Sequence, residues 1–387
     1  MNIFIIPSWY PSSLHPTTGV FFRDQAVVYA RLKPQSNVAI STWGSHDERL
    51  WLSPSSPFRS LGNILLPKPR QTLNALEPNC WEYFSPAFTW SRRLGRGNID
   101  SIIEVHARHL EQFEKDRGKV DVIHAHCAYP AGFIAMHLSE QYDIPYIITE
   151  HMSPFPLPSL EVDFKTLVLP ALNQAKAVLA VSDALKIHMM SHGVRVEPIS
   201  NFIDDQHFKP NQSDGEGFQI LFVGRLEDQK HPQLLMEALA LARAHVDWKC
   251  LIIGEGEHRE QMELMAEELP VKVQFSGWRD LDGLRNAYQS SDVLVMPSRH
   301  ENQPVVILEA KACGLPIVTT PWAGAEQLVQ QHDHLIEPHA DQLFEALLKV
   351  NEKHSSRFEV RKRYEEKWSS RVTVDKLEHV YQKVIED

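Results

Sequence analysis

Cysteine is scarce in this sequence and forms no recognisable motif. Four cysteines occur among 387 residues, and no two of them make a C-x-x-C pair. The spacing therefore supports neither a zinc knuckle nor a thiol redox motif. A disulfide framework is typical of much shorter secreted chains, so we expect none here.

Basic residues are outnumbered by acidic ones. The 39 lysines and arginines stand against 50 aspartates and glutamates, which gives a net charge of -11. General nucleic-acid binders are usually basic, so we expect no nucleic-acid partner. An anionic ligand would have to bind at a local positive pocket.

Long hydrophobic runs are also missing. No stretch approaches the roughly 18 apolar residues of a membrane-spanning helix. The opening MNIFIIPSWYP has no basic start and only a short apolar stretch before Pro7, unlike a signal peptide. We expect a cytoplasmic protein, and we leave peripheral contact with the inner face of a membrane open.

Common phosphate-binding and nucleophile motifs are absent. The sequence contains no G-x-x-x-x-G-K-[ST] loop and no G-x-S-x-G elbow. GEGEHR at 254–259 follows an apolar run but lacks the third glycine of a dinucleotide fingerprint. The chemistry of the chain therefore has to come from another arrangement.

What the sequence does have is a series of short, continuous apolar runs. Runs without alternation suit strands that are buried on both faces. Helical patterns lie between many of them, as at 232–245 and 257–268. Strands alternating with helices indicate βαβ units and parallel sheets. The predicted strands cover residues 2–6, 121–124, 146–149, 178–181, 219–223, 249–253, 271–275, 292–296 and 316–319.

The series stops and restarts at residues 209–217. This segment, KPNQSDGEG, is polar and contains proline and glycine, so we interpret it as a linker between domains. We predict an α/β protein with two doubly wound domains, at 1–208 and 218–365, followed by a C-terminal helix over 366–387. Residues 43–98, rich in Pro, Trp and Phe, look like an irregular insertion in the first domain. Ligands would bind at the carboxyl ends of the strands, in a cleft between the domains.

Two cations follow the first predicted strand of the second domain. In ILFVGRLEDQKH the strand ends at Gly224, and Arg225 and Lys230 come next. Cations beside a glycine turn at the carboxyl end of a strand suit a phosphate group. Two surface cations at a helix start explain this stretch equally well when it is taken alone.

The stretch ENQPVVILE places two carboxylates at the ends of an apolar run. Pro304 fits the first turn of a helix and Gly314 its end. Glu301 then lies in the preceding loop, and Glu309 lies about two turns into the helix. The helix start would offer N–H groups and a positive dipole end to an anion. A partly buried Glu309 needs donors, which ribose hydroxyls would supply, although a solvated helix face is the more common setting.

Histidines follow two strands of the first half. His124 and His126 in VIHAHC stand two residues apart, on one face of a strand, and ITEHM places Glu150 and His151 after another. Metal binding by the histidine pair is an open alternative, but no third ligand stands nearby. Core or cleft-lining histidines are the more common case.

Taken together, these stretches resemble the retaining sugar-nucleotide glycosyltransferases of family 4, which have the GT-B fold of two facing Rossmann-like domains. The family's E-x7-E motif stands here as Glu301 to Glu309, and its G-R-L-x3-K element stands in VGRLEDQK. LIIGEGEHR, FSGW and SDVLVMPS follow in the family's order between them. HAHCAYPAG, TEHM, AVSDAL, ISNFID and the opening PSWYPSSLHPTTGVFFRDQA are similar to its first-domain loops. One E-x7-E would be weak evidence, whereas this ordered series is specific.

The resemblance implies how the donor is held. Arg225 and Lys230 would bind the diphosphate, Glu309 the ribose, and Glu301, with backbone amides at 302–305, the transferred sugar. The leaving diphosphate would be neutralised by cationic side chains, so no metal and no cofactor is required besides a UDP- or GDP-sugar co-substrate. The implied donor-binding residues are Gly19, Gly224, Arg225, Lys230, Gly254, Trp278, Arg279, Glu301, Asn302, Gln303, Pro304, Val305 and Glu309.

The resemblance also implies roles around the reacting sugar. His126 would lie near the reacting carbon and act with Glu301, Arg225 and Lys230 in catalysis, and His151 would lie on the acceptor side. Gly19 would let the N-terminal loop approach the phosphate. The segment around Trp278 and Arg279 would border the nucleotide base.

Two positions depart from the family's pattern. Thr18 precedes Gly19 where the family often has a second glycine. Asn302 and Gln303 follow the first glutamate where the family often has Gly or Ser and then a bulky apolar residue. Two amide side chains beside the sugar could alter the choice of donor, so the sugar and the nucleotide stay open.

The implied activity is transfer of a sugar, with retention, to a hydroxyl of a glycan or lipid-linked acceptor in cell-surface polysaccharide or glycoconjugate biosynthesis. A GT-B sugar-nucleotide epimerase and a non-catalytic sugar-nucleotide-binding subunit are the alternatives. A glycoside hydrolase also uses two carboxylates, but hydrolysis gives no reason for the cations Arg225 and Lys230.

Two further segments bear on the acceptor and the domains. Residues 78–97 mix aromatic side chains with Arg92, Arg93 and Arg96, which suits a membrane interface, although an ordinary packed insertion is favoured. The amphipathic pattern at the C-terminus, in the family, belongs to a helix that crosses back onto the first domain.

Overall fold

The computed structural model describes two compact units. Unit 1 comprises Met1–Val181, Lys186–Ile199 and Val374–Asp387, and unit 2 comprises Ser182–Leu185 and Ser200–Thr373. The structure describes the whole chain except residues 13–14, 16, 45–49, 53–70, 91–96, 157, 162, 212–216, 243–246, 354–355 and 387.

Unit 1 is built on a mainly parallel sheet. Its strands are β1 (Asn2–Pro7), β2 (Asn37–Thr42), β4 (Thr72–Glu77), β5 (Cys80–Phe84), β7 (Val122–His126), β8 (Tyr146–Glu150), β9 (Ala177–Ala180) and β10 (Glu197–Pro198), with β3 (Leu50–Leu52) and β6 (Phe88–Trp90) as a separate pair. The described strands run in the order β10-β9-β8-β7-β1-β2-β5-β4, and each pairing is parallel except that of β4 with β5.

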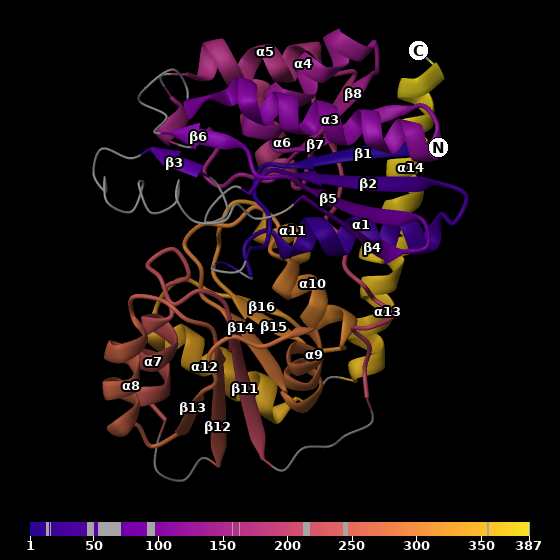
Figure 1. Ribbon diagram of the computed structural model, residues 1–387. Helices are drawn as coiled ribbons and strands as arrows, with labels where there is room; N and C mark the ends of the chain where they lie inside the picture. The colour runs from indigo at the N-terminus through magenta and orange to yellow at the C-terminus, as the bar shows by residue number, and fades with distance from the viewer. Residues whose placement is uncertain are drawn as a thin grey trace. The chain divides into compact units, whose positions relative to one another are not determined.

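Helices cover both faces of this sheet. They are α1 (Val20–Leu32), α3 (Ile99–Arg117), α4 (Phe133–Tyr142), α5 (Leu169–Gln174), α6 (Asp183–Ser191) and the C-terminal α14 (Ser370–Glu386). The chain moves outward from β1 to β2 and then back to β7, so right-handed crossovers place α1 on one face and α3 to α5 on the other (Figure 1).

The first-domain prediction differs from the structure at residues 72–84. This part of the expected insertion 43–98 supplies β4 and β5, and β5 extends the sheet by pairing with β2. Trp81 and Tyr83 on β5 are buried against Phe113. The aromatic side chains that suggested an irregular segment are thus part of the core.

The aromatic and basic stretch 78–97 is only partly described. Its aromatic start is packed as above, whereas Arg92, Arg93 and Arg96 lie outside the described residues. Within the part of the chain that the structure describes, no helix combines the length and apolar character needed to cross a membrane.

The end of α14 belongs to unit 1. From Val374 onward its residues group with the first sheet. The Tyr381 hydroxyl lies 2.6 Å from Nδ1 of His124 on β7, and the Lys33 ammonium lies 2.8 Å from a carboxylate oxygen of Asp375. The C-terminal helix therefore contributes directly to the packing of the N-terminal unit.

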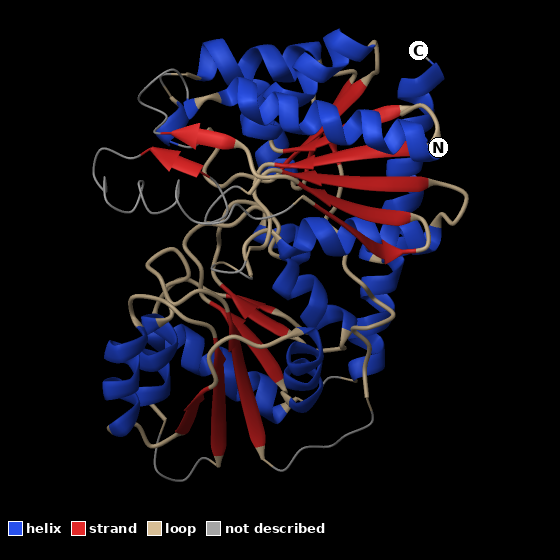
Figure 2. Ribbon diagram, viewed as in Figure 1, coloured by secondary structure: helices blue, strands red, loops and turns tan. Residues whose placement is uncertain are grey.

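Unit 2 is a second doubly wound sheet. Its described strands are parallel, in the order β13-β12-β11-β14-β15-β16. Figure 2 shows this sheet in red with helices on both sides of it. The strands are β11 (Phe218–Val223), β12 (Trp248–Ile253), β13 (Lys272–Phe275), β14 (Val293–Met296), β15 (Ile317–Thr319) and β16 (His334–Leu335). The helices are α7 (Gln233–Ala240), α8 (Arg259–Glu267), α9 (Leu281–Ser290), α10 (Val305–Ala312), α11 (Ala325–Leu328), α12 (Ala340–Glu352) and α13 (Arg357–Trp368).

Two hydrophobic clusters fill the two faces of this sheet. One packs α7, α8 and α12 on it, and the other packs α9, α10 and α13. Because both faces are covered, the strands read as continuous apolar runs. The predicted fold class, α/β with two Rossmann-like parallel sheets, is confirmed.

The border between the units lies earlier than the polar segment 209–217 suggested. The main part of unit 2 begins at Ser200, and Ile203 and Phe208 are buried in its core. Residues 212–216 of the expected linker lie outside the described residues.

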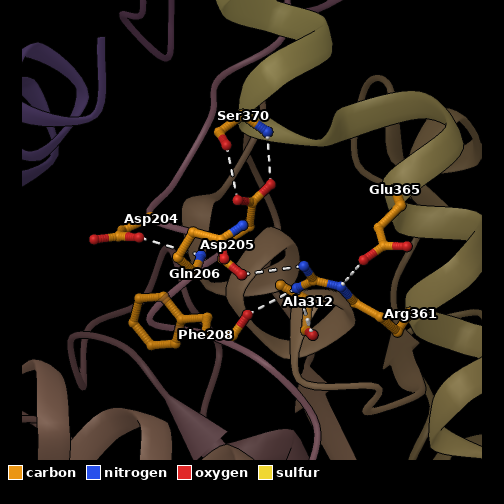
Figure 3. A network of polar contacts seen from close by, with 8 residues as sticks. All are labelled: Asp204, Asp205, Gln206, Phe208, Ala312, Arg361, Glu365 and Ser370. Atoms are coloured by element: carbon orange, nitrogen blue, oxygen red, sulfur yellow. Dashed lines mark hydrogen bonds and ion pairs between the residues drawn. The ribbon is translucent and has the colours of Figure 1, made fainter. Parts of the chain in front are cut away.

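A polar network fastens the segment that enters unit 2 (Figure 3). The Arg361 guanidinium on α13 donates to the carbonyls of Asp205, Phe208 and Ala312 at 3.0, 2.8 and 2.9 Å. The Asp205 carboxylate accepts from the backbone N–H and the hydroxyl of Ser370, each at 2.8 Å. The network thereby ties the entering segment, the end of α10 and the start of α14 together.

A buried histidine network lies between α3 and the sheet of unit 1. The Ser41 hydroxyl lies 2.7 Å from Nδ1 of His106 and 2.8 Å from Nδ1 of His109. The Ser85 hydroxyl lies 2.7 Å from Nε2 of His109. Burial and, to a lesser degree, Arg108 lower the pKa of His109 to about 4.

The free energy of unfolding is expected to fall as the pH drops below 6.5. Burial lowers the pKa of His109 to about 4 and that of His126 to about 3, so the unfolded chain binds protons that the folded chain cannot. The stability is complete above the unfolded pKa and is lost on acidification, by about 2 kcal/mol per histidine between pH 6.5 and pH 5. Melting temperatures from pH 7.5 to 5 test this, and His109→Gln should flatten the profile. An equal slope in that variant would contradict the assignment.

Candidate functional site

The loops after β11 and β12 pack backbone against backbone. A Cβ on Gly254, whose φ is +149°, would lie 1.8 Å from the carbonyl oxygen of Gly224. A Cβ on Gly256 would lie 2.3 Å from the carbonyl oxygen of Leu226. The Leu226 N–H donates to the Glu255 carbonyl at 3.0 Å. Glycine at 254 and 256 is therefore required to fix the turn that leads to Lys230.

This turn meets the loop that precedes α10. The Arg299 N–H donates to the Gln229 carbonyl at 2.8 Å, and the Gln229 side chain donates to the His300 carbonyl at 2.9 Å. These bonds bring the Lys230 ammonium into an ion pair with Glu301. The Glu301 side chain is only 9% exposed, so its charge is shielded from water. A cation and a carboxylate thus stand together at the carboxyl end of the sheet.

The start of α10 adds backbone donors to this pair. Pro304 precedes the helix in an extended conformation, with φ -69° and ψ 125°, and Val305 is the first helical residue. The N–H groups of the first turn have no partner within the helix and carry the positive end of its dipole. Proline has no N–H, so the donors expected over residues 302–305 are those of Asn302, Gln303 and Val305.

Glu309 lies on the buried side of α10. Its side chain is 8% exposed, and the Tyr288 hydroxyl donates to Oε2 at 2.7 Å. Burial, and then the Glu309 charge, raise the pKa of Tyr288, so this hydroxyl stays protonated and donates. A solvated helix face is therefore excluded for Glu309.

Three other predicted donor residues lie at the surface of unit 2. The Arg225 side chain is 74% exposed and pairs with Glu227. Trp278 is 55% exposed, and Arg279 Nε donates to the Ser276 hydroxyl at 3.0 Å. The structure joins Lys230 directly to Glu301, whereas these side chains make their described contacts elsewhere.

The predicted residues of unit 1 form a second group. Nδ1 of His126 lies 3.0 Å from Nε2 of His151, so one ring donates and the other accepts. The Phe22 ring lies 4.7 Å from the His126 ring and 5.2 Å from the His151 ring, centroid to centroid. Gly19, at φ +70°, comes just before α1, and a Cβ there would lie 2.6 Å from the Trp9 carbonyl oxygen.

The His126 ring is a neutral group. Burial lowers its pKa to about 3, which leaves the imidazole uncharged at physiological pH. Burial, with the neighbouring His126 and His151, also lowers the pKa of His124. A neutral ring can donate or accept a hydrogen bond near a substrate without adding positive charge.

Glu150 is a positioning group whose role the sequence did not reveal. Its buried carboxylate accepts from the backbone N–H groups of Ala128, His151 and Met152 at 2.9, 2.8 and 2.9 Å. Burial raises the pKa of Glu150, and these N–H donors oppose that rise. The side chain therefore fixes the segment that follows His126 and the segment that contains His151. The one feature of the sequence that could have indicated this role is that Glu150 is a charged residue at the end of the apolar strand β8.

Among the described residues, one group has the geometry of a cation site. The ligand atoms of Asp228, Glu257 and His258 all lie within 4.8 Å of one another. Both carboxylates are exposed, and Nε2 of His258 lies 2.8 Å from Asp228. The local ion pairs already account for this arrangement.

Two Rossmann-like units with these loops have the architecture of GT-B transferases, and comparison with known proteins gives the family. Residues 203–368 match the model of glycosyl transferases group 1, and residues 48–207 match that of glycosyltransferase family 4. Together the two models cover residues 48–368, so the chain belongs to the glycosyltransferases that they describe, group 1 in its second half and family 4 in its first.

Relatives and a solved structure agree with this assignment. An uncharacterized glycosyltransferase of Methanocaldococcus jannaschii is 30% identical over 249 residues, which are 57% of this chain and 64% of that protein, less than two thirds of its length. A Bacillus subtilis protein named as a teichuronic acid biosynthesis glycosyltransferase is 28% identical over 357 residues, 87% of this chain and 85% of that one. The structure of Anabaena HepE in complex with UDP has a TM-score of 0.70 at 17% identity, covering 99% and 100% of the two chains, and shows the same fold.

Proposed function

We propose that the protein is a retaining glycosyltransferase that moves a sugar from a nucleoside-diphosphate sugar to a hydroxyl of a glycan or lipid-linked acceptor. The observation that carries this proposal is the Lys230–Glu301 ion pair at the start of α10, with Glu309 buried on the same helix. The pair offers a cation to a diphosphate and an acceptor to sugar hydroxyls in one place. HepE, named above, is a complex with UDP, which supports a nucleotide ligand.

The reaction follows from where charge develops. The bond between the anomeric carbon and the phosphate oxygen breaks, and its electron pair stays on the diphosphate. Lys230, Arg225 and the N-terminus of α10 would stabilise that charge, an effect worth a few kcal/mol per donor in other anion holes. The acceptor hydroxyl attacks from the face of the leaving group and gives its proton to a phosphate oxygen. Cationic side chains perform the neutralisation, so the reaction needs no metal.

The other residues orient the two substrates. Glu309 would accept hydrogen bonds from the ribose, while Glu301 and the nearby backbone N–H groups would hold the transferred sugar. Trp278 and Arg279 would border the base, and Gly19 would let the N-terminal loop approach the phosphate. Neutral His126 would bond a hydroxyl close to the reacting carbon, on the side where His151 faces the acceptor.

The place of the reaction is part of the proposal. The Bacillus subtilis relative is named for teichuronic acid biosynthesis, which supports a role in cell-surface polysaccharide assembly. The proposed reaction would take place in the cytoplasm, and a lipid-linked acceptor would bring the protein to the inner face of the membrane.

Nucleotide binding is the first expected result. At a hundred times its dissociation constant, a UDP- or GDP-based ligand should stabilise the wild type by about 2.7 kcal/mol in a thermal-shift panel. Glu309→Ala should bind at least tenfold more weakly, since a hydrogen bond to a charged group contributes about 1.5–3 kcal/mol. Glu309→Gln keeps an acceptor for Tyr288 and separates ligand loss from core damage. The exposed Glu345 on α12 provides a matched control, Glu345→Ala.

The same panel distinguishes the alternatives. No stabilisation by any nucleotide at millimolar concentration would remove the main support for transfer. Binding without release of the sugar would favour a non-catalytic subunit. Conversion of the donor sugar without any acceptor would favour an epimerase.

A further inference from the structure

The loop before α10 is held on a second side, away from the Lys230 turn. Its residue Gln303 contacts Ser200 and Asn201, the first residues of unit 2 after the chain leaves β10. The contact with Asn201 joins side chain to backbone in both directions, and the contact with Ser200 joins two side chains. The loop before α10 is thereby fastened to the segment through which the chain enters unit 2.

The carboxamide of Gln303 uses both of its ends. Its Nε2 donates to the Ser200 hydroxyl at 2.9 Å, and its Oε1 accepts the backbone N–H of Asn201. In return, the Asn201 side chain donates to the Gln303 carbonyl at 2.9 Å. Asn201 is buried, with 5% of its surface exposed, so a lost partner would leave a polar group without water to replace it.

We call the contacts of Gln303 with Ser200 and Asn201 the clamp. Its position matters because it lies beside Glu301 and the start of α10. Gln303 stands two residues after Glu301 and directly before Pro304, which opens α10. Fixing its backbone therefore fixes the path of the chain from the carboxylate of Glu301 to the N–H of Val305. A bulky apolar residue at 303 would keep only the bond from Asn201 to its backbone carbonyl, since its side chain has neither a donor for Ser200 nor an acceptor for the Asn201 N–H.

We propose that Gln303 is a positioning residue, whose side chain is committed to Ser200 and Asn201 and sets the place of Glu301 and of the backbone donors at the start of α10. Its contribution to turnover rests on the proposed transferase function, whereas the clamp itself is a property of the chain alone. The donor sugar nucleotide would contact the backbone of residue 303. The Gln303 side chain would not touch the donor and would affect it only by holding the loop in place.

Hydrogen–deuterium exchange of the ligand-free protein tests the clamp. In Gln303→Ala and in Asn201→Ala, the hydrogen-bonded amides on either side of the loop, those of Arg299 and Ile307, should exchange about tenfold faster than in the wild type. Gln261→Ala, at an exposed glutamine of α8, should leave them unchanged. Unaltered exchange of the Arg299 and Ile307 amides in both clamp variants would overturn the proposal, whatever the protein binds.

Kinetics test the consequence for turnover. With UDP-glucose and GDP-glucose as probes, both alanine variants should lose about tenfold to a hundredfold in the kcat of sugar release, because a small misplacement of a catalytic group is costly. Their dissociation constants for UDP or GDP should stay within threefold of the wild type, since Lys230, Arg225 and Glu309 remain. Gln303→Glu should restore most of the rate, because a carboxylate accepts from Asn201 while the Ser200 hydroxyl turns to donate.

The outcomes separate this inference from the proposed function. A loss of nucleotide affinity in Gln303→Ala, with Asn201→Ala behaving as wild type, would show that Gln303 contacts the donor and would overturn the positioning role. A wild type that binds no nucleotide would contradict the transferase proposal, and the exchange experiment would still decide the clamp.

Discussion

A Lys230→Ala variant is expected to lose about 10²–10³ in kcat, the loss seen when one preorganised donor is removed from an anion hole. The Lys230 ammonium is the cation that the structure places against Glu301. In the variant, the positive charge of Lys230 would no longer stabilise the negative charge that develops on the leaving diphosphate. Lys230→Arg should retain part of the rate, because it keeps the charge but changes the donor geometry. The measurement is single-turnover release of the nucleoside diphosphate from whichever donor the thermal-shift panel identifies.

The control for this experiment must separate lost catalysis from lost charge. Lys272 on β13 is exposed, and its replacement by alanine removes the same charge from the protein. Lys272→Ala should leave the rate within twofold of the wild type. In both variants, unit 1 should unfold as it does in the wild type, because both residues lie in unit 2. A Lys230→Ala enzyme with an undiminished rate would show that the diphosphate is held elsewhere, by Arg225 above all.

The strands of the two sheets could be predicted because the sequence marks them locally. Parallel strands covered on both faces read as unbroken apolar runs, and their ends came within a few residues of the observed ones, as for β11 and β14. The loops that follow such strands then fall at one edge of the sheet. That rule brought the Lys230 turn and the Glu301 loop to the same place without a structure.

The remainder was not predictable because it depends on contacts between distant residues. The strand β4 is the edge of the described sheet and is mostly exposed, so no apolar run marks it, and β5 lies between β4 and β2. The segment after Ser200 is held in unit 2 by contacts with distant residues. For example, the Asp205 carbonyl accepts a hydrogen bond from Arg361, which is more than 150 residues away in the sequence. No local pattern announces that Gln303 will bond Asn201, nor that Glu150 will accept three backbone N–H groups.

A second feature hidden from local patterns is a buried ion pair in unit 2. The Lys311 side chain at the end of α10 is fully buried and pairs with Asp333, which is 1% exposed. Asp333 also accepts from the backbone N–H groups of Ile317 and Gln330, at 2.9 and 2.6 Å. On sequence alone, Lys311 looks like a surface cation in a helix's last turn. Burial lowers its pKa, and the opposing charge of Asp333 works against that shift.

Replacing Lys311 with alanine is therefore expected to lower the free energy of unfolding by about 3–5 kcal/mol, because it leaves the Asp333 charge buried without its counter-ion. Lys311→Met in combination with Asp333→Asn should recover only part of this loss. Methionine fills the volume and no charge remains, but the amide has one acceptor oxygen for the N–H groups of Ile317 and Gln330. Urea unfolding followed by circular dichroism measures both. An unchanged m-value with a shifted midpoint would assign the effect to stability. If Lys311→Ala unfolded at the wild-type urea concentration, the carboxylate would have to be protonated or reached by water, and the pair would contribute nothing to the fold.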